Sequence, residues 1–134
     1  MNRKTRVVVL GGGIGGLSTA MALSATPELR QRFAVTVYSQ GWRLGGKAAS
    51  GRNTDHAMRI EEHGIHMLMG FYDHAFAQLR TVYAERPVGP DNPFRTWQDA
   101  FHPQRLVAVG TPGTPGYWEV RFPQTPGTPG DPRT

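Results

Sequence analysis

The sequence predicts an α/β fold that begins with a parallel βαβ unit, and three stretches of the chain carry this prediction. The apolar run 7–10 is typical of a buried parallel strand, because such strands are covered on both faces and do not alternate. A glycine-rich turn follows, and residues 17–25 then have a helical pattern. A second strand is predicted over 33–38, which is rich in β-branched and aromatic residues. Residues 6–38 therefore form one βαβ unit, whose crossover we expect to be right-handed.

The glycine turn Gly11-x-Gly13-x-x-Gly16 has the spacing of a dinucleotide-binding fingerprint and lies between a strand and a helix. In such a turn Gly11 permits the tight bend, Gly13 lets a pyrophosphate approach the backbone, and Gly16 lets the helix pack on the strand. The helix N-terminus offers free N–H groups to the phosphates, which adds Ile14 and Gly15 to the expected contacts. The alternative is a βα turn with a purely structural role.

The amino terminus also has the three parts of a secretory signal: a basic stretch at 2–6, an apolar stretch, and small residues at 22–25. Glycines interrupt the apolar stretch, however, and they fall in the register of the fingerprint. We therefore favour the cofactor turn over the signal peptide.

Composition limits the remaining classes of function. A chain of 134 residues is the length of one domain. Its net charge of +5 comes from scattered Lys and Arg, so we expect an anionic cofactor and no nucleic-acid partner. The chain has no Cys, which excludes disulfides and thiol chemistry. No apolar run reaches the roughly 18 residues of a membrane span, so we expect a cytoplasmic protein, with peripheral membrane contact left open.

The end of the second strand is where a dinucleotide-binding unit places an acidic residue for the ribose hydroxyls. Ser39 and Gln40 occupy this place, and neither is charged. Ser39 follows Gly11 by 28 positions, which is longer than the usual spacing of about 20. We predict that both residues lie at the adenosine ribose.

A second glycine motif follows in residues 43–47. Gly45 and Gly46 allow the backbone to approach a ligand closely, and Arg43 and Lys47 flank them with positive charge. A plain glycine turn between two elements is an equal alternative at this point.

The rest of the chain predicts further elements. A strand is expected over 58–62, a helix with apolar residues at helical spacing over 72–83, and a short helix over 94–101. Two strands, 104–109 and 117–122, are expected to form a carboxyl-terminal β-hairpin. We divide the chain into a dinucleotide-binding segment (1–86), the start of a second segment (87–124), and a loose tail rich in Pro and Gly (125–134).

A metal site is one interpretation of residues 61–66, because His63-x-x-His66 follows Glu61 and Glu62 and these residue types bind several divalent ions. No third His has a tight spacing, so we predict no metal site and a packed or cofactor-proximal pair instead. No two acidic residues form an assignable general acid and base, so the catalytic residues stay unassigned.

Taken in order, the glycine fingerprint, Arg43-Leu44-Gly45-Gly46-Lys47, and the Glu62-His63-Gly64-Ile65-His66 segment resemble one group of enzymes. The chain is similar, over about residues 5–85, to the amino-terminal part of FAD-dependent oxidoreductases of the flavin amine oxidase and phytoene desaturase superfamily. Gly70 and Tyr72 continue the same pattern.

The resemblance implies an incomplete Rossmann-like unit that binds FAD at the fingerprint glycines. It implies that Arg43, Leu44, Gly45, Gly46 and Lys47 lie near the pyrophosphate and ribityl chain, and that Gly64, Ile65 and His66 approach the flavin ring. The implied activity is that of an oxidoreductase acting on an apolar, isoprenoid-type substrate, with this chain as a fragment.

One departure keeps alternatives open, because Ser39 stands where the family has its ribose-binding Glu. An NAD(P)- or nucleotide-binding module without redox chemistry of its own remains an alternative. An inactive truncated product is another.

Overall fold

The computed structural model describes residues 3–124 and 126–132. The chain divides into two compact units, Met1–Met67 and Leu68–Thr134. Each unit has its own arrangement of helices and strands and is described by itself. The domain limits expected from the sequence stay predictions.

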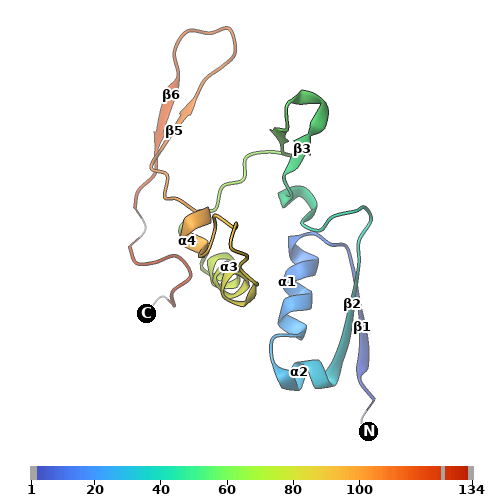
Figure 1. The fold of residues 1–134 in the computed structure, drawn as a ribbon. Helices are drawn as coiled ribbons and strands as arrows, with labels where there is room; N and C mark the ends of the chain where they lie inside the picture. Colours follow the sequence, from blue (N-terminus) through green and yellow to red (C-terminus); the bar gives the residue numbers. More distant parts are fainter. Residues whose placement is uncertain (1–2, 125, 133–134) are drawn as a thin grey trace. The chain divides into compact units, whose positions relative to one another are not determined.

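The first unit begins with the predicted βαβ arrangement (Figure 1). Strand β1 (Thr5–Leu10) leads into helix α1 (Ile14–Leu23), a short helix α2 (Pro27–Arg32) and strand β2 (Phe33–Tyr38). The two strands are parallel, and their register runs from Thr5 opposite Phe33 to Leu10 opposite Tyr38. This confirms the α/β prediction. Helix α1, however, begins at Ile14 rather than at residue 17, because Gly15 and Gly16 lie inside its first turn.

Only one face of this two-stranded sheet is covered, which corrects the expectation that β1 is buried on both faces. Val7 and Val9 are half-buried on the face against α1, and a Cβ built on Gly16 of α1 would lie 3.3 Å from a Val9 methyl group. On the other face Val8 is 53% exposed, Leu10 80% and Tyr38 61%. The described chain supplies a single covering helix, so the strand alternates like a half-buried one.

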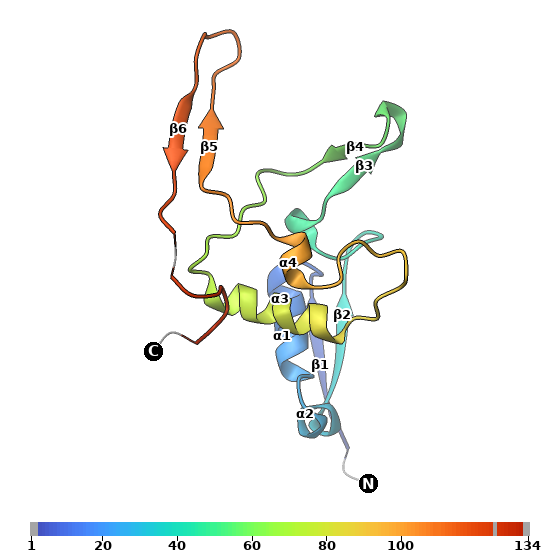
Figure 2. The same ribbon diagram turned by 60° about the vertical axis from the view of Figure 1, so that its left-hand side comes forward.

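A small antiparallel hairpin completes the first unit (Figure 2). It follows the 3₁₀ turn η1 (Gly46–Ala48) and consists of β3 (Gly51–Asn53) and β4 (Arg59–Glu61), with the 3₁₀ turn η2 (Thr54–His56) between them. The predicted strand 58–62 is thus shorter than expected, because Met58 has a positive φ of 60° and belongs to the turn. Its partner β3 is a strand that the sequence pattern does not indicate.

The second unit has an aromatic core on helix α3 (Asp73–Glu85), which corresponds to the predicted helix 72–83. Two residues of the expected apolar face, Tyr72 and Val82, are 44% and 40% exposed. Phe76 is the buried residue of this helix, at 5% exposure. Its ring lies edge-on to Trp97 of the short helix α4 (Trp97–Ala100), with centroids 5.7 Å apart, and to Phe101, at 6.2 Å. Trp97 therefore belongs to the local core.

The predicted carboxyl-terminal hairpin is present as β5 (Leu106–Val109) and β6 (Trp118–Arg121), which pair antiparallel. The described part of the tail, 126–132, has contacts with α3, and the expectation of a loose segment stays a prediction. Gly130 lies so close to Phe76 and Ala77 that a Cβ on it would be 2.8 Å from the Ala77 nitrogen, and Asp131 pairs with Arg80. Residues 125, 133 and 134 of the predicted tail lie outside the described residues.

Candidate cofactor-binding site

The fold itself requires two glycines of the fingerprint. Gly11 has a φ of +107°, a conformation that side chains disfavour, and its N–H donates to the Tyr38 carbonyl at 2.7 Å. A Cβ on Gly16 would lie 2.0 Å from the Gly11 carbonyl oxygen, so only glycine allows α1 to approach the turn. Both residues do what the fingerprint predicts for the backbone.

Gly13 is different, because nothing in its protein surroundings requires glycine. Its φ of −78° and ψ of 178° suit any residue, and a Cβ there would meet no atom within 4 Å. Gly15 also faces open space, and Ile14 is 59% exposed. The space above the turn is therefore free on the side where the fingerprint places a pyrophosphate.

The amino terminus of α1 faces this space with unpaired donors. The N–H groups of Ile14, Gly15 and Gly16 belong to the first helical turn and have no acceptor within the helix. No side chain caps the helix at Gly13. Such an end combines free N–H groups with the positive pole of the helix dipole, which suits a phosphate.

The second glycine motif docks directly on the first. Gly13 and Gly45 form an isolated parallel bridge, and the Gly45 N–H donates to the Gly12 carbonyl at 2.7 Å. Gly45 and Gly46 have φ values of +110° and +59°, and a Cβ on Gly46 would lie 3.1 Å from the Gly13 Cα. Glycines in both motifs thus let the two backbones lie against each other.

Gly12 is a site residue that the fingerprint spacing leaves unspecified. It is buried, and a Cβ there would lie 2.6 Å from both the Ser39 Oγ and a Leu44 methyl group. Ser39 therefore lies just after β2 beside the turn, and its place at the adenosine ribose stays a prediction. Gln40 is exposed next to it. The run of three glycines in the sequence is the signal that could have identified Gly12.

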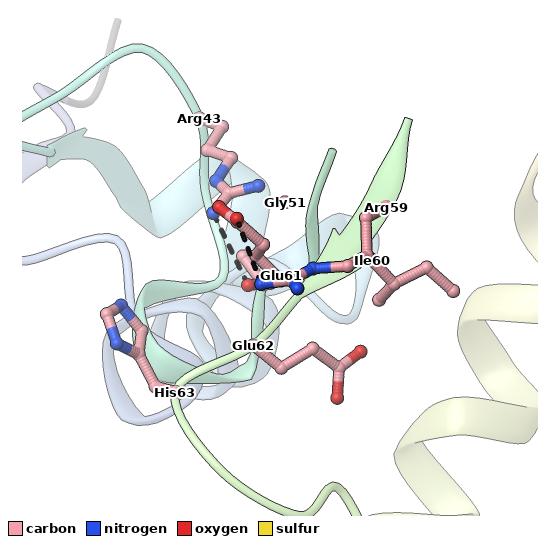
Figure 3. Close-up of a pocket in the computed structure, with 8 residues that line it drawn as sticks. Arg43, Gly51, Arg59, Ile60, Glu61, Glu62 and His63 are labelled. Atoms are coloured by element: carbon pink, nitrogen blue, oxygen red, sulfur yellow. Dashed lines mark hydrogen bonds and ion pairs between the residues drawn. The ribbon is translucent and has the colours of Figure 1, made fainter. Parts of the chain in front are cut away.

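The Arg43 side chain forms hydrogen bonds within its own loop. Its guanidinium donates to the carbonyls of Ser50 and, at 3.4 Å, Ala49, and it lies 5.2 Å from the Trp42 ring centroid. Figure 3 shows this side chain beside the β3–β4 hairpin. Its expected place at the pyrophosphate stays a prediction.

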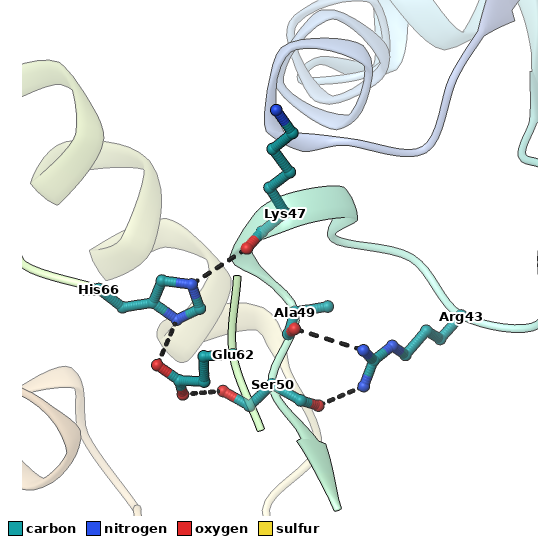
Figure 4. Close-up of polar contacts among 6 residues, drawn as sticks. All are labelled: Arg43, Lys47, Ala49, Ser50, Glu62 and His66. Carbon is teal, nitrogen blue, oxygen red and sulfur yellow. Dashed lines mark hydrogen bonds and ion pairs between the residues drawn. The ribbon is translucent and has the colours of Figure 1, made fainter. Parts of the chain in front are cut away.

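The third motif is tied to the second through His66 (Figure 4). The His66 Nε2 lies 3.0 Å from the Lys47 carbonyl oxygen, and its Nδ1 lies 3.1 Å from a Glu62 carboxylate oxygen. The other Glu62 oxygen accepts from the Ser50 hydroxyl. Gly64 and Ile65 are exposed between these contacts, and the Lys47 amino group extends away from them. Sequence reasoning gave neither Glu62 nor Ser50 a role in linking the motifs, and only their place in the fold reveals one.

An open hollow of about 590 Å³ lies beside the hairpin, lined by Arg43, Ala49, Gly51, Arg59, Ile60, Glu61, Glu62 and His63 (Figure 3). Arg43 is the one residue that it shares with the predicted cofactor set. The other predicted cofactor residues do not line this hollow. Within the described residues, no three His, Cys, Asp or Glu side chains are grouped so that they could hold a metal ion.

The electrostatics of the first unit suit an anionic ligand. Residues 1–67 contain nine Lys or Arg and four Asp or Glu, whereas residues 68–134 contain six of each. The entire net charge of +5 therefore belongs to the unit with the glycine motifs. A positive field of this kind attracts a pyrophosphate.

Comparison with known proteins agrees with this geometry. Residues 9–84 match the NAD(P)-binding Rossmann-like domain family. The chain is 29% identical to the chloroplastic/chromoplastic zeta-carotene desaturase of Arabidopsis thaliana over 122 residues, which cover 90% of this chain and 18% of that protein. The enzymes of the same name from Solanum lycopersicum and Zea mays are 34% identical over 85 residues and 31% identical over 122 residues.

The chain thus spans less than a fifth of the length of these relatives. No solved structure matches it. No helix in the described ranges has the length and apolar character needed to cross a membrane. The names of the relatives place those proteins in plastids, and a cytoplasmic location for this chain stays a prediction.

Proposed function

This chain belongs to the NAD(P)-binding Rossmann-like domain family, and from that premise we propose that it is the FAD-binding portion of a desaturase-type oxidoreductase. The bound flavin would supply hydride acceptance, while the protein supplies binding and orientation. The N–H groups of Ile14, Gly15 and Gly16 would bind the pyrophosphate, and Ser39 would meet the adenosine ribose.

The observation that carries this proposal is the freedom around Gly13. Gly11 and Gly16 are explained by backbone conformation and by helix packing, whereas Gly13 faces open space with an ordinary φ. A glycine that the protein does not need is explained by a ligand that approaches the backbone closely. This favours the cofactor turn over a purely structural one.

Two observations support FAD over a nicotinamide cofactor. The 43–47 segment lies on the glycine turn through the Gly45 amide, as expected if both motifs follow one long cofactor. The relatives at 29–34% identity are named as zeta-carotene desaturases, which fits the phytoene desaturase-like resemblance of the three motifs. An apolar, isoprenoid-type substrate and peripheral contact with a membrane belong to the same proposal.

NAD(P) binding is the second candidate, and Ser39 favours it. Loss of the ribose-binding acid removes the group that repels a 2′-phosphate, and a nearby Arg can then bind that phosphate. The Arg43 guanidinium, however, is already engaged with the Ser50 and Ala49 carbonyls. This leaves it less available for a second anionic partner.

Titration of the purified 134-residue chain with FAD, NAD and NADP separates these candidates. We expect FAD to bind most tightly, with a visible flavin spectrum that persists after gel filtration. A preference for NADP would replace the FAD proposal with the nicotinamide one. Absence of binding by all three, together with a non-cooperative thermal transition, would identify an inactive truncated product.

A further inference from the structure

The Arg43 guanidinium satisfies backbone carbonyls at the end of η1 (Figure 4). It donates to the carbonyl of Ser50 and, at 3.4 Å, to that of Ala49, and these two residues directly follow η1. Carbonyls at the end of a helical turn have no donor within the turn, so a side chain or water must supply one. A guanidinium offers several N–H groups in a planar fork and can serve both carbonyls, whereas a Lys ammonium is a compact charge on a flexible stem.

We infer that Arg43 is a positioning residue: it closes the 43–50 loop on itself, so that Gly45 stays docked on the glycine turn. Its effect on a bound anion is exerted through the backbone of the loop and not through contact with a phosphate. The part of this inference that concerns a dinucleotide rests on the proposed function.

Ala49 connects Arg43 with the glycine turn. A Cβ on Gly45 would lie 3.0 Å from the Ala49 Cβ, so these two residues pack against each other across the loop. The Gly45 N–H in turn donates to the Gly12 carbonyl at 2.7 Å. A hydrogen bond that fixes the Ala49 carbonyl therefore also fixes the side of the loop that pairs with the turn.

The guanidinium lies beside the start of β3. A Cβ on Gly51 would be 3.7 Å from both terminal nitrogens of Arg43, which is an ordinary van der Waals separation. On its own side of the loop, the guanidinium carbon lies 5.2 Å from the centroid of the Trp42 ring. These neighbours give the half-buried Arg43 side chain a defined place inside the loop.

Lys47, the other cation of the motif, has a different situation. Its side chain is exposed, and the described residues provide no acceptor for its amino group. Figure 4 shows this group pointing away from the contacts of Arg43. The two cations thus divide the work: Arg43 orders the loop, and Lys47 offers its charge to the anion.

Hydrogen exchange at two amides tests the positioning role without a ligand. The Gly45 N–H reports the docking of the loop, and the Gly11 N–H, which donates to the Tyr38 carbonyl, reports the β1–β2 unit. In Arg43→Lys and in Arg43→Gln we expect the Gly45 amide to exchange about threefold to tenfold faster than in the parent, with the Gly11 amide unchanged.

Arg59→Gln is the matched control for this measurement. It removes a cation that lines the same hollow as Arg43 but pairs with Glu61, so exchange at Gly45 should stay at the parental rate. Equal acceleration at Gly11 and Gly45 in the Arg43 variants would mean that Arg43 only stabilises the whole unit, and it would refute the positioning role. Unchanged exchange at Gly45, or a Gly45 amide without protection in the parent, would refute it as well.

FAD titration at low and high salt separates positioning from direct contact. We expect Arg43→Lys to bind FAD as weakly as Arg43→Gln, about threefold to tenfold below the parent, because Lys keeps the charge but loses the fork. Lys47→Gln should weaken binding and also make it less dependent on salt, since it removes a charge that faces the anion. Parental affinity in Arg43→Lys would show that the charge suffices and would overturn the inference. If the parent binds no FAD, the proposed function fails, and exchange at Gly45 still decides the role of Arg43.

Discussion

Gly13 and Gly45 lie side by side in an isolated parallel bridge, which joins two glycine motifs that are 32 positions apart in the chain. The Gly45 amide donates to Gly12, so the second motif adds a short strand-like pairing to the turn of the first. A Cβ on Gly12 would lie 2.6 Å from a Leu44 methyl group, and one on Gly46 would lie 3.1 Å from the Gly13 Cα, so these two glycines allow the segments to lie against each other.

Gly16→Ala should destabilise the first unit. Its Cβ would lie 2.0 Å from the Gly11 carbonyl oxygen, which is backbone and cannot rotate away. We expect a loss of about 1–3 kcal/mol in the free energy of unfolding, measured by urea denaturation. Gly15→Ala is the control for stability: its Cβ meets nothing within 4 Å, so it should leave stability equal or raise it by up to about 1 kcal/mol.

Gly13→Ala should separate ligand binding from folding. The backbone conformation and the open space permit alanine, and because alanine is a poorer N-cap than glycine the unfolding free energy should fall by only about 1 kcal/mol or less. The added methyl group should clash with a pyrophosphate and weaken FAD binding by roughly tenfold or more, measured by fluorescence titration. Unchanged FAD affinity in this variant would show that the cofactor does not approach the backbone at Gly13.

Ser39→Glu should restore a carboxylate at the ribose position. A hydrogen bond to a charged group contributes about 1.5–3 kcal/mol, so binding of a cofactor with a free 2′-hydroxyl should tighten by about tenfold or more. NADP binding should weaken, because the carboxylate repels the 2′-phosphate. Ser39→Gln serves as the uncharged control of similar size, and competition titrations with FAD and NADP provide the measurement.

Leu10 and Val9 should respond differently, because they point to opposite faces of the sheet. Leu10 is 80% exposed, so Leu10→Gln should change the unfolding free energy by no more than about 0.5 kcal/mol. Val9 is half-buried against α1, and Val9→Ala should cost about 1 kcal/mol. A large loss of stability in Leu10→Gln, measured by chemical denaturation, would mean that another element covers this face in solution.

Asp99 should make the stability of the α4 region depend on acid pH. Hydrogen bonds from the Thr96 backbone and side chain, and from the Arg95 backbone, lower the pKa of this carboxyl below its usual range. A lowered folded-state pKa contributes stability above the ordinary carboxyl pKa of about 3.9 and loses it as the pH falls. The thermal midpoint of Asp99→Asn should therefore lie below that of the parent at neutral pH and approach it in acid.

The local elements follow from the sequence because their signals are local. Each of these signals acts over a few residues. They are the β-branched residues of β2, the apolar spacing around Phe76 in α3, and the Pro-Gly turn between β5 and β6. The structural roles of Gly11 and Gly16 could likewise be predicted. The positive φ at Gly11 and the close packing at Gly16 both require glycine, so the residue type itself indicates them. The sequence alone therefore determined the βαβ unit and the place of its glycine turn.

The tertiary structure decided which of these segments meet. Strand β3 has no strand pattern in its sequence and forms by pairing with β4. Helix α1 covers one face of the β1–β2 sheet, while Leu10 on the other face is exposed. The contact between Gly45 and Gly12 joins residues 33 positions apart, and the contact between Ser50 and Glu62 joins residues 12 positions apart. Residue spacing cannot specify such contacts, because they depend on the path of the intervening chain and on backbone groups that every residue shares.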